Sequence, residues 1–458
     1  MLVCNLVVNS LVVKNLVVNS LAVNRVMTGS GMMNRVVASR AITVLLLSFC
    51  QSGLSDVASA QLSGGFTAAL QAAVMHNPLI KEQSAELDAQ GHNIGSAKAG
   101  RFPSLSAQAN SLEEEYDQGT MRLQQPLWAF GKIDNQIDQA QAEFGVQQWD
   151  LYRNQRSLIE STAAAYAAID GIQQQIEVAG INVEEHERLY QRIKRRQEGK
   201  LASEADVRLA YSRRVMADSQ QQRLVNERMI ALTELQALTQ VAVAADESID
   251  SSLVDLPLLS ALHSQARANS AELRYQRELL EVVKLDIKKE KIASTPTIYF
   301  RVEHEFLDTP DGFEETRAGF AIEANVEGLG LADRGRIRSA ASRLTAAQYA
   351  VDVSATDVER RVNKLVLSRR LQHSLGVSQQ LALTALEETM ASFVRQYESG
   401  RKSWLEVLNT QRELTELRLQ LAQINSDWLT LSLRLSALTG GLDTLAGLDI
   451  PRQQENRL

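Results

Sequence analysis

The stretch from Tyr397 to Gly440 is the feature that most limits how this chain can fold. After the turn signal Glu398-Ser399-Gly400, it reaches Gly440 without another glycine and without a proline. At about 1.5 Å per residue, a helix of this length would extend roughly 55 Å. A seven-residue apolar repeat predicts that the helix supercoils lengthwise on a partner helix. The repeat consists of residues spaced alternately three and four apart: Leu414, Leu417, Leu421, Ile424, Trp428, Leu431, Leu435 and Leu438.

The composition of the whole chain agrees with long helices. Only seven prolines and 24 glycines interrupt 458 residues, and aromatic residues make up 5%. Long segments are rich in Ala, Leu, Gln, Glu and Arg, which is typical of extended helical structure. The formal net charge of −7 and the lack of a Lys/Arg run argue against a nucleic-acid-binding surface.

Residues 1–60 are interpreted as a leader that contains a secretory signal peptide. The first 55 residues contain no Asp or Glu, and Arg35 and Arg40 precede the short apolar run Ala41–Phe49. The run is followed by Ala58-Ser59-Ala60, which predicts cleavage after Ala60. Met33 is the expected true start. Both cysteines lie in this leader, so the mature chain is expected to contain no disulfide.

The rest of the chain is one pattern written twice. Residues 61–245 are the first repeat and residues 258–445 the second, with a linker at 246–257 and a short tail at 446–458. Each repeat reads as helix, β-hairpin, long helix, tight turn and long helix. The copies are in step at an offset of 200, because Ser203-Glu-Ala-Asp-Val207 corresponds to Ser403-Trp-Leu-Glu-Val407.

The hairpins are indicated by a change of period from helix to strand after Pro103 and after Pro296. In the second copy Ile298, Phe300 and Val302 alternate with polar residues, and the alternation resumes after the turn at 308–312 as far as Val326. Strands of about ten residues with one apolar and one charged face are typical of a membrane β-barrel. Two hairpins are too few to close a barrel, so several chains are expected to share one.

No pattern in the sequence predicts an enzyme. The six histidines are scattered without metal-ligand spacing, and no phosphate-binding glycine loop follows a strand and opens a helix. We therefore expect no catalytic, cofactor-binding or metal-binding residues, and no cofactor. The charged residues near the two helix–helix turns remain as candidate functional residues. On the residues alone, they are also consistent with a solvated coiled-coil end.

The mature chain resembles the TolC-like outer membrane factor family. The resemblance covers Leu62 to Leu448 and includes the duplicated order and the corner Gln125-Pro-Leu-Trp128. Its most specific part is Tyr397-x-x-Gly-x-x-Ser-x-x-Glu-Val-Leu408. The resemblance implies a mainly α-helical homotrimer with a 12-stranded outer-membrane barrel, four strands per chain. That barrel would continue into a long periplasmic α-helical coiled-coil barrel.

The resemblance also assigns candidate gate residues at the tapering end of the tunnel. Tyr397 and Lys402 fall where a Tyr and an Arg tether the inner helix pair to the outer pair, and Asp206 falls where an Asp receives them. Gly199 and Gly400 are the expected helix-turn glycines. Because Lys402 replaces Arg, a bidentate contact is lost and the tether is expected to be weaker.

Two further positions correspond to rings of acidic side chains that narrow the pore in that family. Glu406 keeps the acid and Asn409 replaces it. One of the two charged rings is therefore expected to be neutral, and cation binding at the pore mouth is expected to fall.

The resulting functional hypothesis is a passive, gated exit duct in the outer membrane of a Gram-negative cell. Expected partners are two further copies, outer-membrane lipid, a periplasmic membrane-fusion adaptor and an ABC or proton-driven inner-membrane transporter, with no nucleic acid. Type I protein secretion is the favoured function, because the corner Trp128–Asp134 resembles that of family members that export adhesins. Small-molecule efflux is the alternative. A periplasmic coiled-coil scaffold without a pore is the rival from another class.

Overall fold

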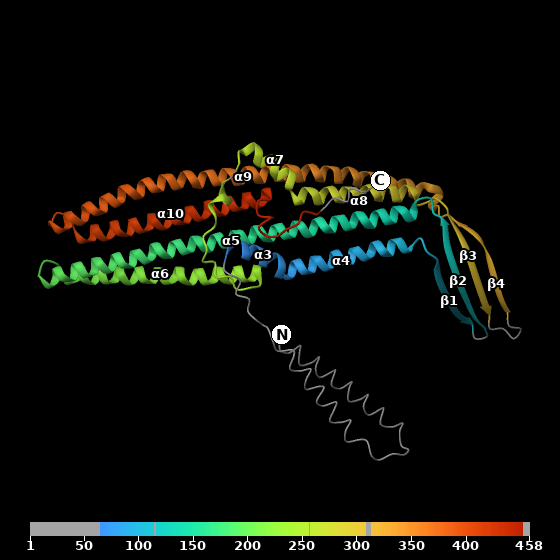
Figure 1. The fold of residues 1–458 in the computed structure, drawn as a ribbon, viewed down its shortest axis with the longest axis horizontal. Helices are drawn as coiled ribbons and strands as arrows, with labels where there is room; N and C mark the ends of the chain where they lie inside the picture. Colours follow the sequence, from blue (N-terminus) through green and yellow to red (C-terminus); the bar gives the residue numbers. More distant parts are fainter. Residues whose placement is uncertain (1–64, 114–115, 256, 308–312, 452–458) are drawn as a thin grey trace, which may run out of the picture. The chain divides into compact units, whose positions relative to one another are not determined.

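The computed structural model describes residues 65–113, 116–255, 257–307 and 313–451. They lie within one unit, Gln61–Leu458. The interpretations of residues 1–60, including the signal peptide and the start at Met33, fall outside the described residues. Within this unit the long helices lie side by side and the strands extend from one end of them (Figure 1).

The predicted order of elements occurs twice. The first copy contains α3 (Phe66–His76), α4 (Pro78–Ala99), β1 (Ser104–Glu113), β2 (Tyr116–Trp128), α5 (Lys132–Glu198) and α6 (Glu204–Thr239). The second contains α7 (Leu259–Asn269), α8 (Ala271–Ile292), β3 (Thr297–Leu307), β4 (Phe313–Glu323), α9 (Leu331–Glu398) and α10 (Trp404–Thr439). Two short 3₁₀ helices complete the chain: η1 (Ser251–Val254) and η2 (Glu327–Gly330).

The long helices match their predicted positions, while the first helix of each repeat is broken in two. α5 and α9 have 67 and 68 residues, or about 100 Å at 1.5 Å per residue. The break between α3 and α4 lies at Asn77, whose side chain accepts a hydrogen bond from the Leu79 N–H, with Pro78 at the first helical position. Ser270 caps α8 in the same way at Leu273. Capping residues therefore end a helix that period alone would have continued.

α5 lies at the centre of the helical layer. Away from the strands it packs between α6 and α10, and α10 packs in turn on α9. Toward the strands it packs between α4 and α8, and α8 packs on α9. The flanks of the layer are thus α9 on one side and α4 and α6 on the other (Figure 1). In the described part of the chain, none of the helices combines the length and apolar character needed to cross a membrane.

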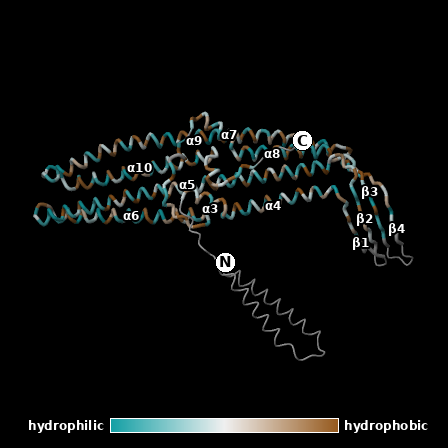
Figure 2. Tube along the Cα trace, viewed as in Figure 1, coloured by the Kyte–Doolittle hydropathy of each residue, from teal (hydrophilic) through white to brown (hydrophobic). Residues whose placement is uncertain are grey.

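α10 packs through two different faces. Part of its leucine repeat faces α9, where the Arg369 guanidinium lies 4.6 Å from the centre of the Trp428 ring. Another buried face contacts α5 and includes small polar residues among its apolar ones. Thr415 Oγ1 donates to Asn182 Oδ1 at 2.7 Å, and Ser426 lies directly against Gly171. Polar and apolar residues accordingly alternate along the helices (Figure 2).

The four strands form one antiparallel sheet in the order β1-β2-β3-β4. The two hairpins join through β2 and β3, and one row across the sheet is Leu105, Leu123, Val302 and Ala318. The prediction that alternation continues to Val326 is wrong, because β4 ends at Glu323. The chain turns away at η2, where Gly328 and Leu329 both have positive φ angles.

Candidate gate at the helix turns

The two helix–helix turns share one backbone geometry. At the end of α5, the Leu201 N–H donates to Arg196 O at 2.8 Å, and at the end of α9 the Arg401 N–H donates to Gln396 O at 2.9 Å. Each bond closes a Schellman turn, which needs a left-handed residue just beyond the helix. In the second copy that residue is Gly400, with φ of 76°.

In the first copy the left-handed residue is Lys200, with φ of 58°. The glycine predicted to serve this turn, Gly199, has φ of −78° and lies at the preceding position, equivalent to Ser399. Its conformation is open to any residue. Gly199 and Gly400 therefore do not play equivalent roles, and the first turn contains a strained lysine where the second has glycine.

Each turn restarts in a helix closed by a capping box. The Ser203 hydroxyl accepts from the Asp206 N–H at 3.1 Å, and the Asp206 carboxylate accepts from the Ser203 N–H at 3.2 Å. Ser403 and Glu406 repeat this arrangement at 3.3 and 3.0 Å. The S-x-x-D and S-x-x-E spacing was the available sequence signal, and it shows that both candidate acids have a local structural role.

Tyr397 belongs to a small apolar core that holds the tip together. It is 8% exposed, and the centre of its ring lies 5.0 Å from that of Trp404. The cluster draws on α5, α6, α9 and α10 and includes Leu189, Ile193, Ala210, Val407 and Leu408. Tyr397 is thus fixed by packing across the two helix pairs.

Arg196 of α5 is a contact of Tyr397 that the sequence did not suggest. Its guanidinium carbon lies 4.9 Å from the centre of the Tyr397 ring, within the range of a cation–π contact. Burial raises the pKa of the Tyr397 phenol, the Arg196 charge lowers it, and the Asp206 charge raises it. Asp206 therefore lies close enough to Tyr397 to influence its pKa electrostatically.

Lys402 does not pair with Asp206 within the chain. Its ammonium nitrogen lies 2.6 Å from Glu406 Oε1, one helical turn away, and 4.2 Å from the centre of the Phe393 ring. The Lys402 and Ser403 hydrogen bonds lower the pKa of the Glu406 carboxyl to about 2. Asn409 is exposed on the same helix.

A further link joins α5 to the end of α9. Arg192 Nη1 lies 3.2 Å from Glu398 Oε1, and both side chains are about half exposed. Nothing in the sequence indicated this pair, because the two residues are brought together only by the packing of the repeats. Together with Arg196 and Tyr397, it connects the first helix pair to the second at the tip.

Besides its apolar core, the tip is linked by exposed ion pairs such as Arg192–Glu398. Exposed ion pairs contribute about 0–1 kcal/mol each, so rearranging them costs little. In the ranges that the structure describes, no three His, Cys, Asp or Glu side chains converge in a way that could hold a metal ion.

Comparisons with known proteins agree with this architecture. Residues 69–242 match the family model described as outer membrane efflux protein. None of the proteins with curated functions matches the sequence.

Several solved structures share the fold. CusC, described in relation to transmembrane channel formation, has a TM-score of 0.72 at 16% identity over 84% of this chain and 95% of that chain. The outer membrane protein VceC of Vibrio cholerae gives 0.68 at 17% identity over 82% and 96%. The MtrE outer membrane channel of Neisseria gonorrhoeae gives 0.67 at 16% identity over 83% and 90%.

These likenesses establish the fold, and the family match adds a relation in sequence. That match covers most of the first repeat, and the residue string from Tyr397 to Leu408 lies in the second repeat, outside the matched residues. Over residues 69–242 this chain is similar to outer membrane efflux proteins, and its fold is that of the solved outer membrane channels.

Proposed function

We propose that three copies of this chain form one passive, gated duct through the outer membrane. The observation that carries the proposal is the four-stranded sheet. Its strands have 10 to 13 residues, long enough to cross a bilayer at a tilt. Four strands cannot close a barrel, whereas three copies supply twelve.

The two faces of the sheet differ as the wall of a water-filled barrel requires. On one face Phe300 and Phe320 pack edge to face with 5.8 Å between ring centres, and Phe320 is 78% exposed. On the other face Arg122 pairs with Glu303 at 2.7 Å. Lipid on the apolar side and water on the charged side would satisfy both. The outer edges of β1 and β4 would pair with neighbouring copies, because unpaired edges are not tolerated in lipid.

The flanks of the helical layer also support self-assembly. Large apolar side chains on α6 and α9 are exposed in the single chain, although these are the helices that a neighbouring copy would meet. On α6 they include Tyr211, Val215, Met229 and Ile230; on α9 they include Leu367, Leu371 and Leu381. Packing α6 of one copy against α9 of the next would bury both rows and close the tunnel.

The tip is proposed as the gate and as the end that meets its partners. Closure within each chain is maintained by Arg192–Glu398 and Arg196–Tyr397, and the Asp206 carboxylate is available to Lys402 of a neighbouring copy. A membrane-fusion adaptor and an inner-membrane transporter would engage this end. Which adaptor and which transporter these are depends on the substance that the duct exports.

The description of the matching family supports small-molecule efflux as the transport function. Type I protein secretion is the second candidate, and the observation favouring it is the corner Trp128–Asp134 that links β2 to α5. A deletion strain separates them. Loss of a secreted protein from the medium with unchanged tolerance to dyes and detergents indicates secretion, and the opposite pattern indicates efflux.

Two measurements test the duct itself. Membrane fractionation and light scattering in detergent should give an outer-membrane trimer, and planar bilayers should show ion conductance. A soluble monomer would overturn the proposal. A membrane-free coiled-coil scaffold, the rival interpretation, would give no conductance at any protein concentration.

A further inference from the structure

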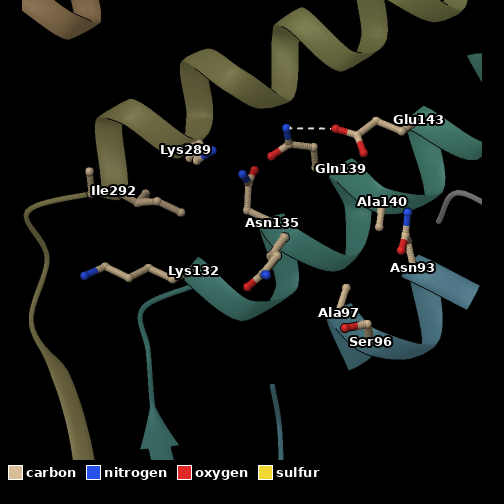
Figure 3. Close-up of a pocket in the computed structure, with 12 residues that line it drawn as sticks. Asn93, Ser96, Ala97, Lys132, Asn135, Gln139, Ala140, Glu143, Lys289 and Ile292 are labelled. Carbon is tan, nitrogen blue, oxygen red and sulfur yellow. Dashed lines mark hydrogen bonds between the residues drawn. The ribbon is translucent and has the colours of Figure 1, made fainter. Parts of the chain in front are cut away.

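A cavity lies where the helical layer meets the sheet. It has a volume of about 600 Å³ and is lined by residues of α4, α5 and α8 (Figure 3). Lys132, the first residue of α5, lies at its sheet end, and Ile292, the last residue of α8, lies beside it. The floor of the cavity is formed farther along α5 by Gln139 and Glu143.

Lysine residues line the cavity from two helices. Lys289 of α8 is exposed and forms no ion pair with any residue that the structure describes. The Lys132 ammonium donates to Thr295 O at 2.6 Å, which leaves two of its N–H groups available. An anion in the cavity would therefore meet one unpaired ammonium group and part of a second.

Asn135 provides a hydrogen-bond acceptor, in contrast to the donor groups of the two lysines. This residue is 2% exposed, and its amide nitrogen donates to Leu285 O at 3.2 Å. Because a carbonyl oxygen can only accept, the amide cannot be turned over, and Oδ1 has to point away from Leu285. Oδ1 is buried without a hydrogen-bond partner, and the side chain lines the cavity. A buried acceptor of this kind costs about 1–3 kcal/mol unless a donor reaches it.

The acceptor side continues along α5. Gln139 Nε2 donates to Glu143 Oε1 at 3.1 Å, the bond drawn in Figure 3, and also to Asp286 Oδ1 at 3.1 Å. Gln90 Nε2 donates to Glu143 Oε2 at 3.0 Å, so both carboxylate oxygens are held in place at the floor. From the sheet inward, the cavity presents first Lys132 and then acceptor groups. Its apolar walls are Ile292, Ala97 and Ala140.

The cavity lies at the height of the membrane interface. Three large aromatic side chains are exposed at the junction of sheet and helices: Phe102, Trp128 and Phe130. Trp128 and Phe130 pack edge to face with 6.0 Å between ring centres. Exposed aromatic side chains gather where a bilayer meets water, and Lys132 lies only two residues beyond Phe130.

We propose that this cavity binds the head group of a zwitterionic phospholipid of the periplasmic leaflet. Lys289 and Lys132 hold the phosphate, the ammonium group donates to Asn135 Oδ1 and faces the Glu143 carboxylate, and the glycerol lies against Ile292. Along α5 the order of charges matches, because Lys132 lies on the sheet side of Asn135 and Glu143, and the phosphate of a phospholipid lies between its acyl chains and its ammonium group. The inference rests on the sheet lying in the outer membrane, as the proposed duct requires.

Native mass spectrometry of the delipidated full-length protein tests the proposal, with phosphatidylethanolamine and phosphatidylglycerol as probes. The wild type should retain phosphatidylethanolamine in preference. Lys289→Ala should lower its affinity about tenfold, since hydrogen bonds to charged groups contribute about 1.5–3 kcal/mol. Lys288→Ala is the matched control, because Lys288 is the adjacent lysine, pairs with Asp138 at 3.5 Å and does not line the cavity. It should change the affinity less than twofold.

Asn135→Leu tests the acceptor side through selectivity, which a merely structural change would not alter. The preference for phosphatidylethanolamine over phosphatidylglycerol should disappear. Equal losses in Lys288→Ala and Lys289→Ala would overturn the site, as would equal retention of the two lipids by the wild type. Free phosphoethanolamine bound as tightly as the lipid would show a soluble ligand instead. Bilayer conductance of Lys289→Ala should stay at the wild-type value, so failure of the lipid site is distinguishable from failure of the duct.

Discussion

Lys402, which precedes α10, and Glu406 in its first turn form an ion pair, with 2.6 Å between Nζ and Oε1. The same carboxylate closes the capping box by accepting from the Ser403 N–H at 3.0 Å. The lysine that corresponds to the tethering arginine thus reinforces the start of α10. This local pair and the contacts of Arg192 and Arg196 with α9 add to the apolar core around Tyr397 that holds the tip together.

The Lys402–Glu406 pair predicts that the helix turns at the tip become less stable in acid. The Lys402 and Ser403 hydrogen bonds lower the pKa of Glu406 from 4.5 to about 2. A lowered pKa contributes stability that is fully present above about pH 4.5 and is lost as the pH falls through about 2. Limited digestion with pepsin between pH 5 and about 2 should therefore show tip cleavage only near the lower limit. Lys402→Ala removes the largest cause of the shift and should move the onset of cleavage toward pH 4.5.

Arg401→Ala is the control for this experiment, since it removes the adjacent exposed cation and leaves the Lys402–Glu406 pair intact. Its onset should stay with the wild type. A common onset for Lys402→Ala and the wild type would contradict the role of the Lys402–Glu406 pair.

A charge exchange tests the link between α5 and α9. Arg192→Glu places like charges at a site where Arg192 Nη1 and Glu398 Oε1 are 3.2 Å apart. The loss of an exposed pair costs about 1 kcal/mol at most, or about fivefold in an opening equilibrium. Channel open probability in planar bilayers should rise by up to that factor. The double exchange with Glu398→Arg should restore closure, and a double variant as open as the single one would show that this pair does not hold the gate.

Much of the fold follows from local signals. Period, prolines and turn residues located the hairpins and the long helices because each signal acts within a few residues of its effect. The same holds for the Lys402–Glu406 pair, because its two residues are only four positions apart in the sequence. Local reasoning also missed the capping boxes at Ser203 and Ser403, although S-x-x-D/E marks them.

The remainder depends on which helix faces which. The leucine repeat of α10 explained its contact with α9, but the small polar residues Thr415 and Ser426, which contact α5, carry no hydrophobic signal. The Arg192–Glu398 contact joins residues about 200 positions apart. No period within either helix could have predicted these partners.

Lys200 makes the first turn less stable than the second. A left-handed conformation costs a non-glycine residue roughly 1–2 kcal/mol, and Lys200 has φ of 58°. Lys200→Gly should therefore slow hydrogen exchange at the first turn by up to about tenfold, while Gly400→Lys should speed exchange at the second. Gly199→Ala, at an unstrained φ of −78°, should change neither. A strong effect of Gly199→Ala would contradict the assignment of the left-handed position.

Gly171 permits the close approach of α5 and α10. A Cβ atom there would lie 2.1 Å from Ser426 Oγ and 2.3 Å from Ser426 Cβ. Gly171→Ala should therefore destabilise the assembly by about 1–3 kcal/mol, measured as the temperature of dissociation on heating in detergent. Ser426→Gly in the same chain should recover part of the loss. Gly95→Ala, where no atom lies within 4 Å, should be neutral or stabilising by up to about 1 kcal/mol.

The orientation of the sheet can be tested with one lysine on each face. Phe320 lies on the apolar face and is 78% exposed, and Ala321 is the next residue on the charged face, opposite Tyr299. A lysine on the lipid side of a barrel costs about 2–4 kcal/mol near the middle of the bilayer, whereas a lysine in the lumen remains in water. Phe320→Lys should therefore lower the yield of folded trimer in lipid vesicles at least tenfold, measured by resistance to urea. Ala321→Lys should fold normally and change the ion selectivity of the channel. The reverse pattern would show that the charged face is the one in contact with lipid, and equal folding of both variants would show that the sheet does not lie in a membrane.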